Sequence, residues 1–321
     1  MKKFMIVASA LATLAVLSAC SAAGDDEDGG QTIGVLLLNG DTYFTNVATG
    51  IEDANKGGET IVTNYDGDAG KEAEAVDNMI SRGVDAIVTS PLDGEASAAA
   101  LDRAASEGIE VVCYNTCIDD AENSETVSAF VLSDQAGMGE QTGEYAAKYL
   151  QKNVNGPVTF GVLHCDSFDI CKQRRDAFFA TLDDAGINYS IAAENEELVV
   201  DKAVPAAEDM LTSNPQINAL WGANDGATAG LVRAVESGPG AGKTPVFGSD
   251  MTPVLAKYLK ATPPTLLTTT GQDGIATGEK AVEVVTTLAD DGSVDPFTQE
   301  VPVVNFSVDD LPAVDAYLNA N

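Results

Sequence analysis

Hydroxyl, amide and carboxylate side chains follow a short apolar run in two stretches of the chain that resemble each other. In residues 82–94 the polar part begins at Ser90, and in residues 214–226 it begins at Asn224 and Asp225. Such side chains can donate and accept several hydrogen bonds each. In open α/β sheets, ligands lie beyond the carboxyl ends of the strands. The repeat therefore predicts two similar lobes that each offer a strand-end loop to one cleft.

The segments that must position these loops alternate between apolar runs and amphipathic helical patterns. The runs are typical of parallel strands buried on both faces, and Gly83 and Gly186 follow helical segments as helix-ending residues. We expect strands over residues 32–38, 60–65, 85–90, 109–114, 128–133, 157–163, 188–193, 219–223, 245–248, 266–270 and 301–306. We expect helices over residues 43–56, 71–82, 96–107, 136–152, 172–185, 202–212, 226–237, 254–259 and 275–288. Right-handed crossovers then predict parallel sheets.

This alternation favours an α/β fold of two doubly wound parallel-sheet lobes over a TIM barrel, because a barrel gives the motif no reason to repeat halfway. One unit lacks a closing helix and the other a closing strand, so we expect the chain to cross between the lobes near residues 133–134, 271–272 and 300–302. The predicted N-terminal lobe comprises residues 32–133 and 272–299, and the C-terminal lobe residues 134–271 and 300–321. Three adjacent connections of this kind would form a three-strand hinge.

The N-terminus has the pattern of a signal peptide over residues 1–20. Lys2 and Lys3 precede an apolar run over residues 4–17, which is shorter than the roughly 20 residues needed to span a bilayer. Small residues before Cys20 resemble a bacterial lipobox, which implies lipidation of Cys20; an ordinary cleavage site beside a stray cysteine is the alternative. Residues 21–31 are rich in Gly, Asp and Ala and predict a flexible tether.

The charge balance excludes nucleic acid as a partner. The chain has 50 acidic and 17 basic residues and a formal net charge of −33, so its field repels nucleic acid and anionic headgroups. The acidic residues are spread over the chain rather than collected in one run. They indicate a solvated surface, and adaptation to salt is a second interpretation.

Four cysteines remain after Cys20, at positions 113, 117, 165 and 171. An even number outside the cytoplasm favours disulfides, and four cysteines allow three pairings. We favour the local pairs Cys113–Cys117 and Cys165–Cys171, which would rigidify two loops near the cleft. A zinc site that also uses His164 is disfavoured, because the spacing is not C-x-x-C and the compartment is oxidising.

Five stretches together resemble the periplasmic sugar-binding proteins of the ribose/galactose-binding type, which are the substrate-binding components of ABC transporters. These stretches are residues 80–93, 174–178, 221–226 and 246–250, and Gln272 placed six residues before Gly278. They occur in the family's order and spacing within a likeness that covers residues 32–318. The resemblance implies the periplasmic binding protein type I fold and a lipoprotein that binds its solute without catalysis.

The resemblance also implies a set of ligand-binding residues. Asn115 and Thr116 replace an Asp-Arg pair of the family, and Leu198 stands near an aromatic position, so the identity of the sugar is open. Amide, carboxylate and guanidinium groups suit hydroxyl-rich ligands, and aromatic rings suit their C–H faces. The implied residues are Asp41, Tyr43, Phe44, Ser90, Asn115, Thr116, Arg174, Asn224, Asp250 and Gln272.

Each of these residues has a purely structural alternative. Tyr43 and Phe44 open a helix and could anchor it to the core. Helix capping is the alternative for Ser90, Asn224 and Asp250. Arg174 has a neighbour, Arg175, that competes for its role, and Trp221 lies in an apolar strand, which favours the core over a stacking platform.

We therefore expect an extracytoplasmic, lipid-anchored monomer that captures a neutral sugar or polyol and delivers it to an ABC transporter permease. A chemosensory receptor for a sugar, a nucleoside or a furanosyl signal is the alternative. An enzyme is disfavoured because the chain has no G-x-S-x-G, no P-loop and no G-x-G-x-x-G after the first strand. No cofactor and no metal are expected.

Overall fold

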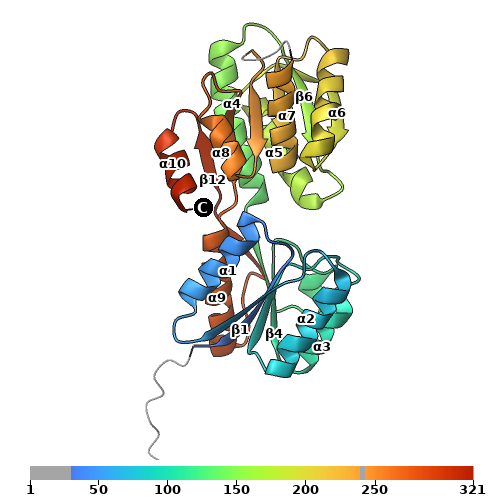
Figure 1. The fold of residues 1–321 in the computed structure, drawn as a ribbon, viewed down its shortest axis with the longest axis vertical. Helices are drawn as coiled ribbons and strands as arrows, with labels where there is room; N and C mark the ends of the chain where they lie inside the picture. The colour runs from blue at the N-terminus through green and yellow to red at the C-terminus, as the bar shows by residue number, and fades with distance from the viewer. Residues whose placement is uncertain (1–29, 239–242, 321) are drawn as a thin grey trace, which may run out of the picture.

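The computed structural model describes residues 30–238 and 243–320, which form two α/β lobes stacked along the long axis of the molecule (Figure 1). Each lobe is built on one six-stranded sheet with helices on both faces. The predicted fold class is confirmed. The predicted signal peptide, Cys20 and all of the predicted tether except Gly30 and Gln31 lie outside the described residues.

The first sheet has the order β11-β5-β4-β3-β1-β2, and all of its strands run parallel. Its strands are β1 (Thr32–Leu37), β2 (Glu59–Asn64), β3 (Ala86–Thr89), β4 (Glu110–Tyr114), β5 (Ala129–Ser133) and β11 (Thr298–Val301). Helices α1 (Thr42–Ala54) and α9 (Gly274–Asp291) cover one face, and α2 (Ala69–Arg82) and α3 (Ala98–Ser106) cover the other. A 3-10 turn over Ala121–Asn123 follows β4.

The second sheet has the order β12-β10-β9-β8-β6-β7, with only β12 antiparallel to its neighbour. Its strands are β6 (Val158–His164), β7 (Tyr189–Glu196), β8 (Ala219–Gly222), β9 (Val246–Ser249), β10 (Leu266–Gly271) and β12 (Val304–Ser307). Helices α4 (Gln135–Asn153) and α5 (Asp169–Asp184) cover one face. The other face carries α6 (Val200–Ser213), α7 (Asp225–Ser237), α8 (Pro253–Leu259) and α10 (Leu311–Ala320).

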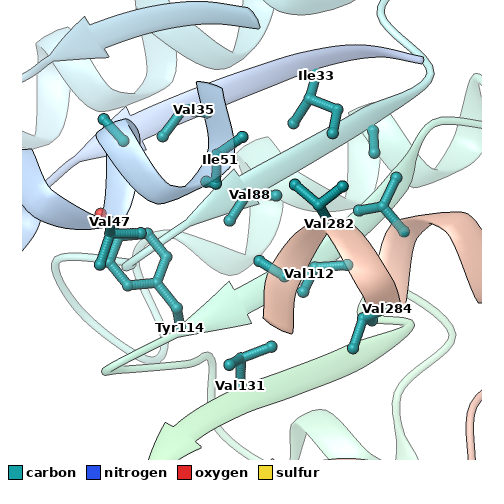
Figure 2. Packing of buried hydrophobic residues seen from close by; sticks show 14 of the residues in the cluster. Ile33, Val35, Val47, Ile51, Val88, Val112, Tyr114, Val131, Val282 and Val284 are labelled. Atoms are coloured by element: carbon teal, nitrogen blue, oxygen red, sulfur yellow. The ribbon is translucent and has the colours of Figure 1, made fainter. Parts of the chain in front are cut away.

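Helices α1 and α9 are far apart in sequence but lie side by side in the first lobe (Figure 1). Their apolar faces pack on Val35, Val88 and Val112 of the sheet (Figure 2). The two helices approach closely at Gly278, which has no side chain. A Cβ atom there would lie 2.2 Å from the Val47 carbonyl oxygen. This close packing holds α1 against α9, and α1 carries two of the predicted site residues, Tyr43 and Phe44.

The chain passes from one sheet to the other at three places, after Ser133, after Gly271 and between Val301 and Val304. The strand expected over residues 301–306 is wrong: it is two strands, β11 and β12, that belong to different sheets. Pro302 lies between them and has no amide hydrogen for a strand ladder. Helix α10 was not expected either. Within residues 30–238 and 243–320, no helix is both long and apolar enough to cross a bilayer.

Candidate functional site

A cavity of about 270 Å³ lies between the two lobes, at the carboxyl ends of their strands. Six of the predicted residues line it: Asp41, Tyr43, Phe44, Asn115, Asp250 and Gln272. Four further lining residues were not predicted as contacts: Thr42, Asp225, Met251 and Thr252. The remaining predicted residues, Ser90, Thr116, Arg174 and Asn224, do not line it.

The aromatic wall of the cavity comes from the first turn of α1. Phe44 is buried in the core of the first lobe, with its ring centroid 6.1 Å from that of Tyr114. The Tyr43 ring meets Phe44 edge-on at 5.4 Å, and burial raises the pKa of the Tyr43 phenol. Phe44 therefore both lines the cavity and is packed in the core of the first lobe.

Asn115 reaches the cavity from a tight turn after β4. Its backbone is left-handed, with φ at 59°, and its side-chain Nδ2 donates to Ser90 Oγ at 3.2 Å. Ser90 and Thr116 share a hydroxyl–hydroxyl bond of 2.8 Å, and Thr116 Oγ1 donates to the Pro91 carbonyl oxygen at 2.7 Å. Ser90 and Thr116 thus support Asn115 from behind the wall of the cavity.

Asp250 is the centre of the opposite wall. Its carboxylate accepts from Arg174 Nη1 at 3.2 Å to each oxygen, and from Gln272 Nε2 at 3.3 Å. The Asp225 backbone amide donates to Asp250 Oδ2 at 3.3 Å. Asp250 has a left-handed backbone with φ at 64°, which turns its carboxylate toward these donors. It is not a helix cap, because Thr252 caps α8.

Arg174 and Arg175 have different surroundings, which separates their roles. The Arg174 side chain is 3% exposed, and it donates to Gln135 Oε1 at 2.7 Å and to the Ala223 carbonyl oxygen at 3.1 Å, in addition to Asp250. Arg175 is partly buried and instead pairs with Asp166 and Glu194. Arg174 therefore anchors the cavity wall behind Asp250.

Asn224 caps helix α7, which is the structural alternative to ligand binding given for it above. Its Oδ1 accepts from the Ala227 amide at 2.9 Å at the start of α7, and its Nδ2 donates to the Leu198 carbonyl oxygen at 3.0 Å. Both ends of the amide are therefore used inside the second lobe. Trp221 is fully buried and stacks on Phe178 at 5.3 Å, so its assignment to the core is confirmed.

Asp225, the second member of the polar pair with Asn224, contributes a carboxylate to the cavity, although the implied set of ligand-binding residues included only Asn224 of the two. It directly follows Asn224 in the polar stretch that ends residues 214–226. Although the side chain retains contact with solvent, burial between the walls of the cleft, followed by the charges of Asp250 and Asp41, raises its pKa to about 6.

The structure contains the disulfides Cys113–Cys117 and Cys165–Cys171. No thiolate from these four residues is then free to bind zinc together with His164. Among the described residues, no group of three or more His, Cys, Asp or Glu side chains is arranged to hold a metal ion.

The cavity presents more hydrogen-bond acceptors than donors. Asp41, Asp225 and Asp250 bring carboxylates, and Gln272 Oε1 is buried with no hydrogen-bond partner in the part of the chain that the structure describes. A buried oxygen without a donor is costly, so a ligand that supplies hydroxyl donors would stabilise this wall. Tyr43 and Phe44 on the opposite wall are aromatic, and aromatic rings suit the C–H groups of such a ligand.

A larger cavity, of about 480 Å³, lies between α6 and α7, away from the interlobe cleft. Its lining includes Glu208, Pro215 and Ala234, and none of the strand-end residues described above.

The sequence profile described as periplasmic binding protein domain matches residues 33–293. The ABC transporter periplasmic-binding protein YphF of Escherichia coli (strain K12) is 38% identical over 234 residues, which cover 72% of each chain. The periplasmic ribose ABC transporter protein of Conexibacter woesei has a similar structure, with a TM-score of 0.77 at 19% identity over 90% of this chain and 95% of that chain. A solute-binding protein of Actinobacillus succinogenes with bound D-allose has a TM-score of 0.76 at 23% identity, over 88% and 99% of the two chains.

Proposed function

The chain belongs to the periplasmic binding protein domain family, and on that premise we propose that it captures a neutral sugar or polyol between its two lobes and delivers it to the permease of an ABC transporter. It is a binding protein and not an enzyme, as its family is. The relatives named for ribose or holding D-allose support this class of ligand.

The observation that carries the proposal is that one cavity takes its walls from both lobes. Tyr43, Phe44 and Asn115 come from the first lobe, and Asp225 and Asp250 come from the second. A ligand that contacts both walls gains contacts when the lobes approach, and only such differential contacts can shift the protein toward a closed state. The three crossings between the sheets are the proposed hinge.

The charges of the cavity favour a neutral ligand over an anionic one. Three carboxylates line it, and the neighbouring guanidinium of Arg174 is already bonded to Asp250. A phosphate or carboxylate on the sugar would meet acceptors and negative charge, and the described residues that line the cavity include no lysine or arginine. Hydroxyl groups can donate to the carboxylates and to Gln272 Oε1.

The remaining expectations belong to the same proposal. Cleavage of the signal peptide and lipidation of Cys20 would hold the protein outside the cytoplasm on a membrane, with residues 21–31 as tether. One lobe would comprise residues 32–133 and 272–299, and the other residues 134–271 and 300–321. The boundary between residues 299 and 300 lies near the break at Pro302. We propose that the protein acts as a monomer.

The test is a thermal-shift screen of the mature chain against neutral sugars, polyols and nucleosides, with the phosphates and uronic acids of the same sugars as matched anions. A ligand at a hundred times its Kd stabilises the folded state by about 2.7 kcal/mol. We expect stabilisation by a neutral compound, none by its anionic partner, and compaction on binding in small-angle scattering. Absence of any stabilising sugar or polyol, or equal stabilisation by the anions, would contradict the proposal.

A further inference from the structure

The turn that carries Asn115 has a left-handed backbone at its central residue, a conformation that most residue types avoid. The Thr116 amide donates to the Tyr114 carbonyl oxygen at 2.6 Å, which closes a three-residue turn around Asn115. With a positive φ at the central residue, this is the rare and strained variety of such turns. Strained backbone persists only where the surrounding structure enforces it.

The disulfide Cys113–Cys117 flanks this turn on both sides. Cys113 belongs to β4, where it is fully buried and in register with Thr89 and Phe130 of the two neighbouring strands. The bond therefore ties the far end of the turn to the interior of the sheet, with the two Cα atoms 5.3 Å apart. Between the two cysteines, Asn115 is the residue that lines the cavity.

The second disulfide has a different relation to the cavity. None of residues 165–171 lines the cavity. The loop between Cys165 and Cys171 is also held by the Asp166–Arg175 ion pair and by the Ser167 amide, which donates to Glu196 at 2.9 Å. The nearby Arg174 is fixed by Gln135, Ala223 and Asp250, which lie on other elements.

We infer that the Cys113–Cys117 disulfide is a positioning element of the ligand site, which holds Asn115 in the conformation that presents its amide to the ligand, whereas Cys165–Cys171 stabilises the second lobe without setting affinity. The inference rests on the proposed function. Without the bond, the turn relaxes in the free protein and must be ordered again when the ligand binds, which weakens binding.

The two disulfides provide a matched pair of variants in the full chain. Cys117→Ala and Cys171→Ala each open one short loop and leave a fully buried partner, Cys113 or Cys165. With a ligand found for the wild-type protein, we expect isothermal titration to give about tenfold weaker binding for Cys117→Ala, since strain of this kind is worth roughly one decade in an equilibrium constant. We expect Cys171→Ala to bind within about twofold of wild type, although both variants melt at lower temperature.

A double-mutant cycle separates positioning from general loosening of the first lobe. Because the disulfide acts through Asn115, adding Cys117→Ala to Asn115→Ala should change affinity little beyond the single Asn115→Ala variant. Equal affinity of Cys117→Ala and wild type, equal losses in the two cysteine variants, or additive losses in the cycle would overturn the inference.

If Cys117→Ala does not fold, partial reduction of the wild-type protein gives the same comparison, with the opened disulfide identified by peptide mass mapping. Opening Cys113–Cys117 alone should weaken binding, and opening Cys165–Cys171 alone should not. Failure of the oxidised wild type to bind any sugar or polyol would contradict the proposed function instead.

Discussion

Arg174 Nη1 lies 3.2 Å from both carboxylate oxygens of Asp250, and this pair joins the interior of the second lobe to the wall of the cleft. The guanidinium is 3% exposed and the carboxylate side chain 21% exposed. Arg174 is positioned by Gln135 and Ala223, so the orientation of Asp250 depends on three separate elements of the lobe.

Replacement of Arg174 should therefore damage both stability and binding. Arg174→Gln leaves a partly buried carboxylate without its cation, which destabilises a protein by about 3 kcal/mol. Arg175→Gln, the adjacent control, loses two ion pairs of a side chain that is 20% exposed, so its destabilisation should be smaller than that of Arg174→Gln. Urea unfolding followed by the fluorescence of the single tryptophan, Trp221, gives both values. A larger loss for Arg175→Gln than for Arg174→Gln would show that the wrong arginine was chosen.

Gly278 should tolerate no side chain. A Cβ atom there would lie 2.2 Å from the Val47 carbonyl oxygen, which belongs to the backbone of α1 and cannot move alone. We expect Gly278→Ala to destabilise the protein by about 1–3 kcal/mol through this overlap, as measured by the urea midpoint. Gly70→Ala, in the first turn of α2, where the nearest atom is the side-chain oxygen Asp68 Oδ1 at 3.2 Å rather than backbone at 2.2 Å, should change the midpoint less. Equal effects of the two substitutions would argue against close packing of α1 on α9.

Asn224 should behave as a helix cap when it is replaced. Asn224→Ala removes the acceptor for the Ala227 amide and is expected to cost about 1 kcal/mol of stability. Asn224→Ser retains an oxygen that can cap α7, so it should recover most of that loss. The urea midpoints of the two variants measure the difference, and a serine variant as unstable as the alanine variant would exclude the capping role.

Asp225 should make stability depend on pH between about 6 and 4. Burial and the charges of Asp250 and Asp41 raise its folded-state pKa to about 6, from 3.8. A carboxyl with a raised pKa binds protons more readily in the folded state, so its contribution to stability improves as the pH falls through 6 and is lost as the pH rises. Asp225→Asn should therefore melt above wild type at pH 7.5, with a margin that vanishes near pH 4.

The control for this experiment is Glu74→Gln, which removes one exposed carboxylate of α2 far from the cleft. It tests whether relief of the chain's overall negative charge explains the result. A pH-dependent margin of the same size in Glu74→Gln, or a constant margin in Asp225→Asn, would contradict the raised pKa.

The order of strands and helices follows from the sequence because its signals are local. Apolar runs and helical spacing report which residues must be buried, and Gly83 and Gly186 mark helix ends through their positive φ. The three passages between the sheets lie close to the predicted positions for the same reason. The break at Pro302 and the helix α10 were missed, although a proline within an apolar run already argues against a continuous strand.

The sequence by itself indicated that polar residues gather where strands end, and its resemblance to the sugar-binding family implied ten contacts, of which Asp41, Tyr43, Phe44, Asn115, Asp250 and Gln272 line one cavity. Only the tertiary structure decided which of the polar side chains face the cavity and which make hydrogen bonds within the lobes. Ser90, Arg174 and Asn224 make hydrogen bonds or ion pairs within the protein, whereas Asp225 lines the cavity. Chain direction brings strand ends together, but side-chain direction within a loop depends on individual backbone angles, such as the left-handed turns at Asn115 and Asp250, and on contacts between residues distant in sequence.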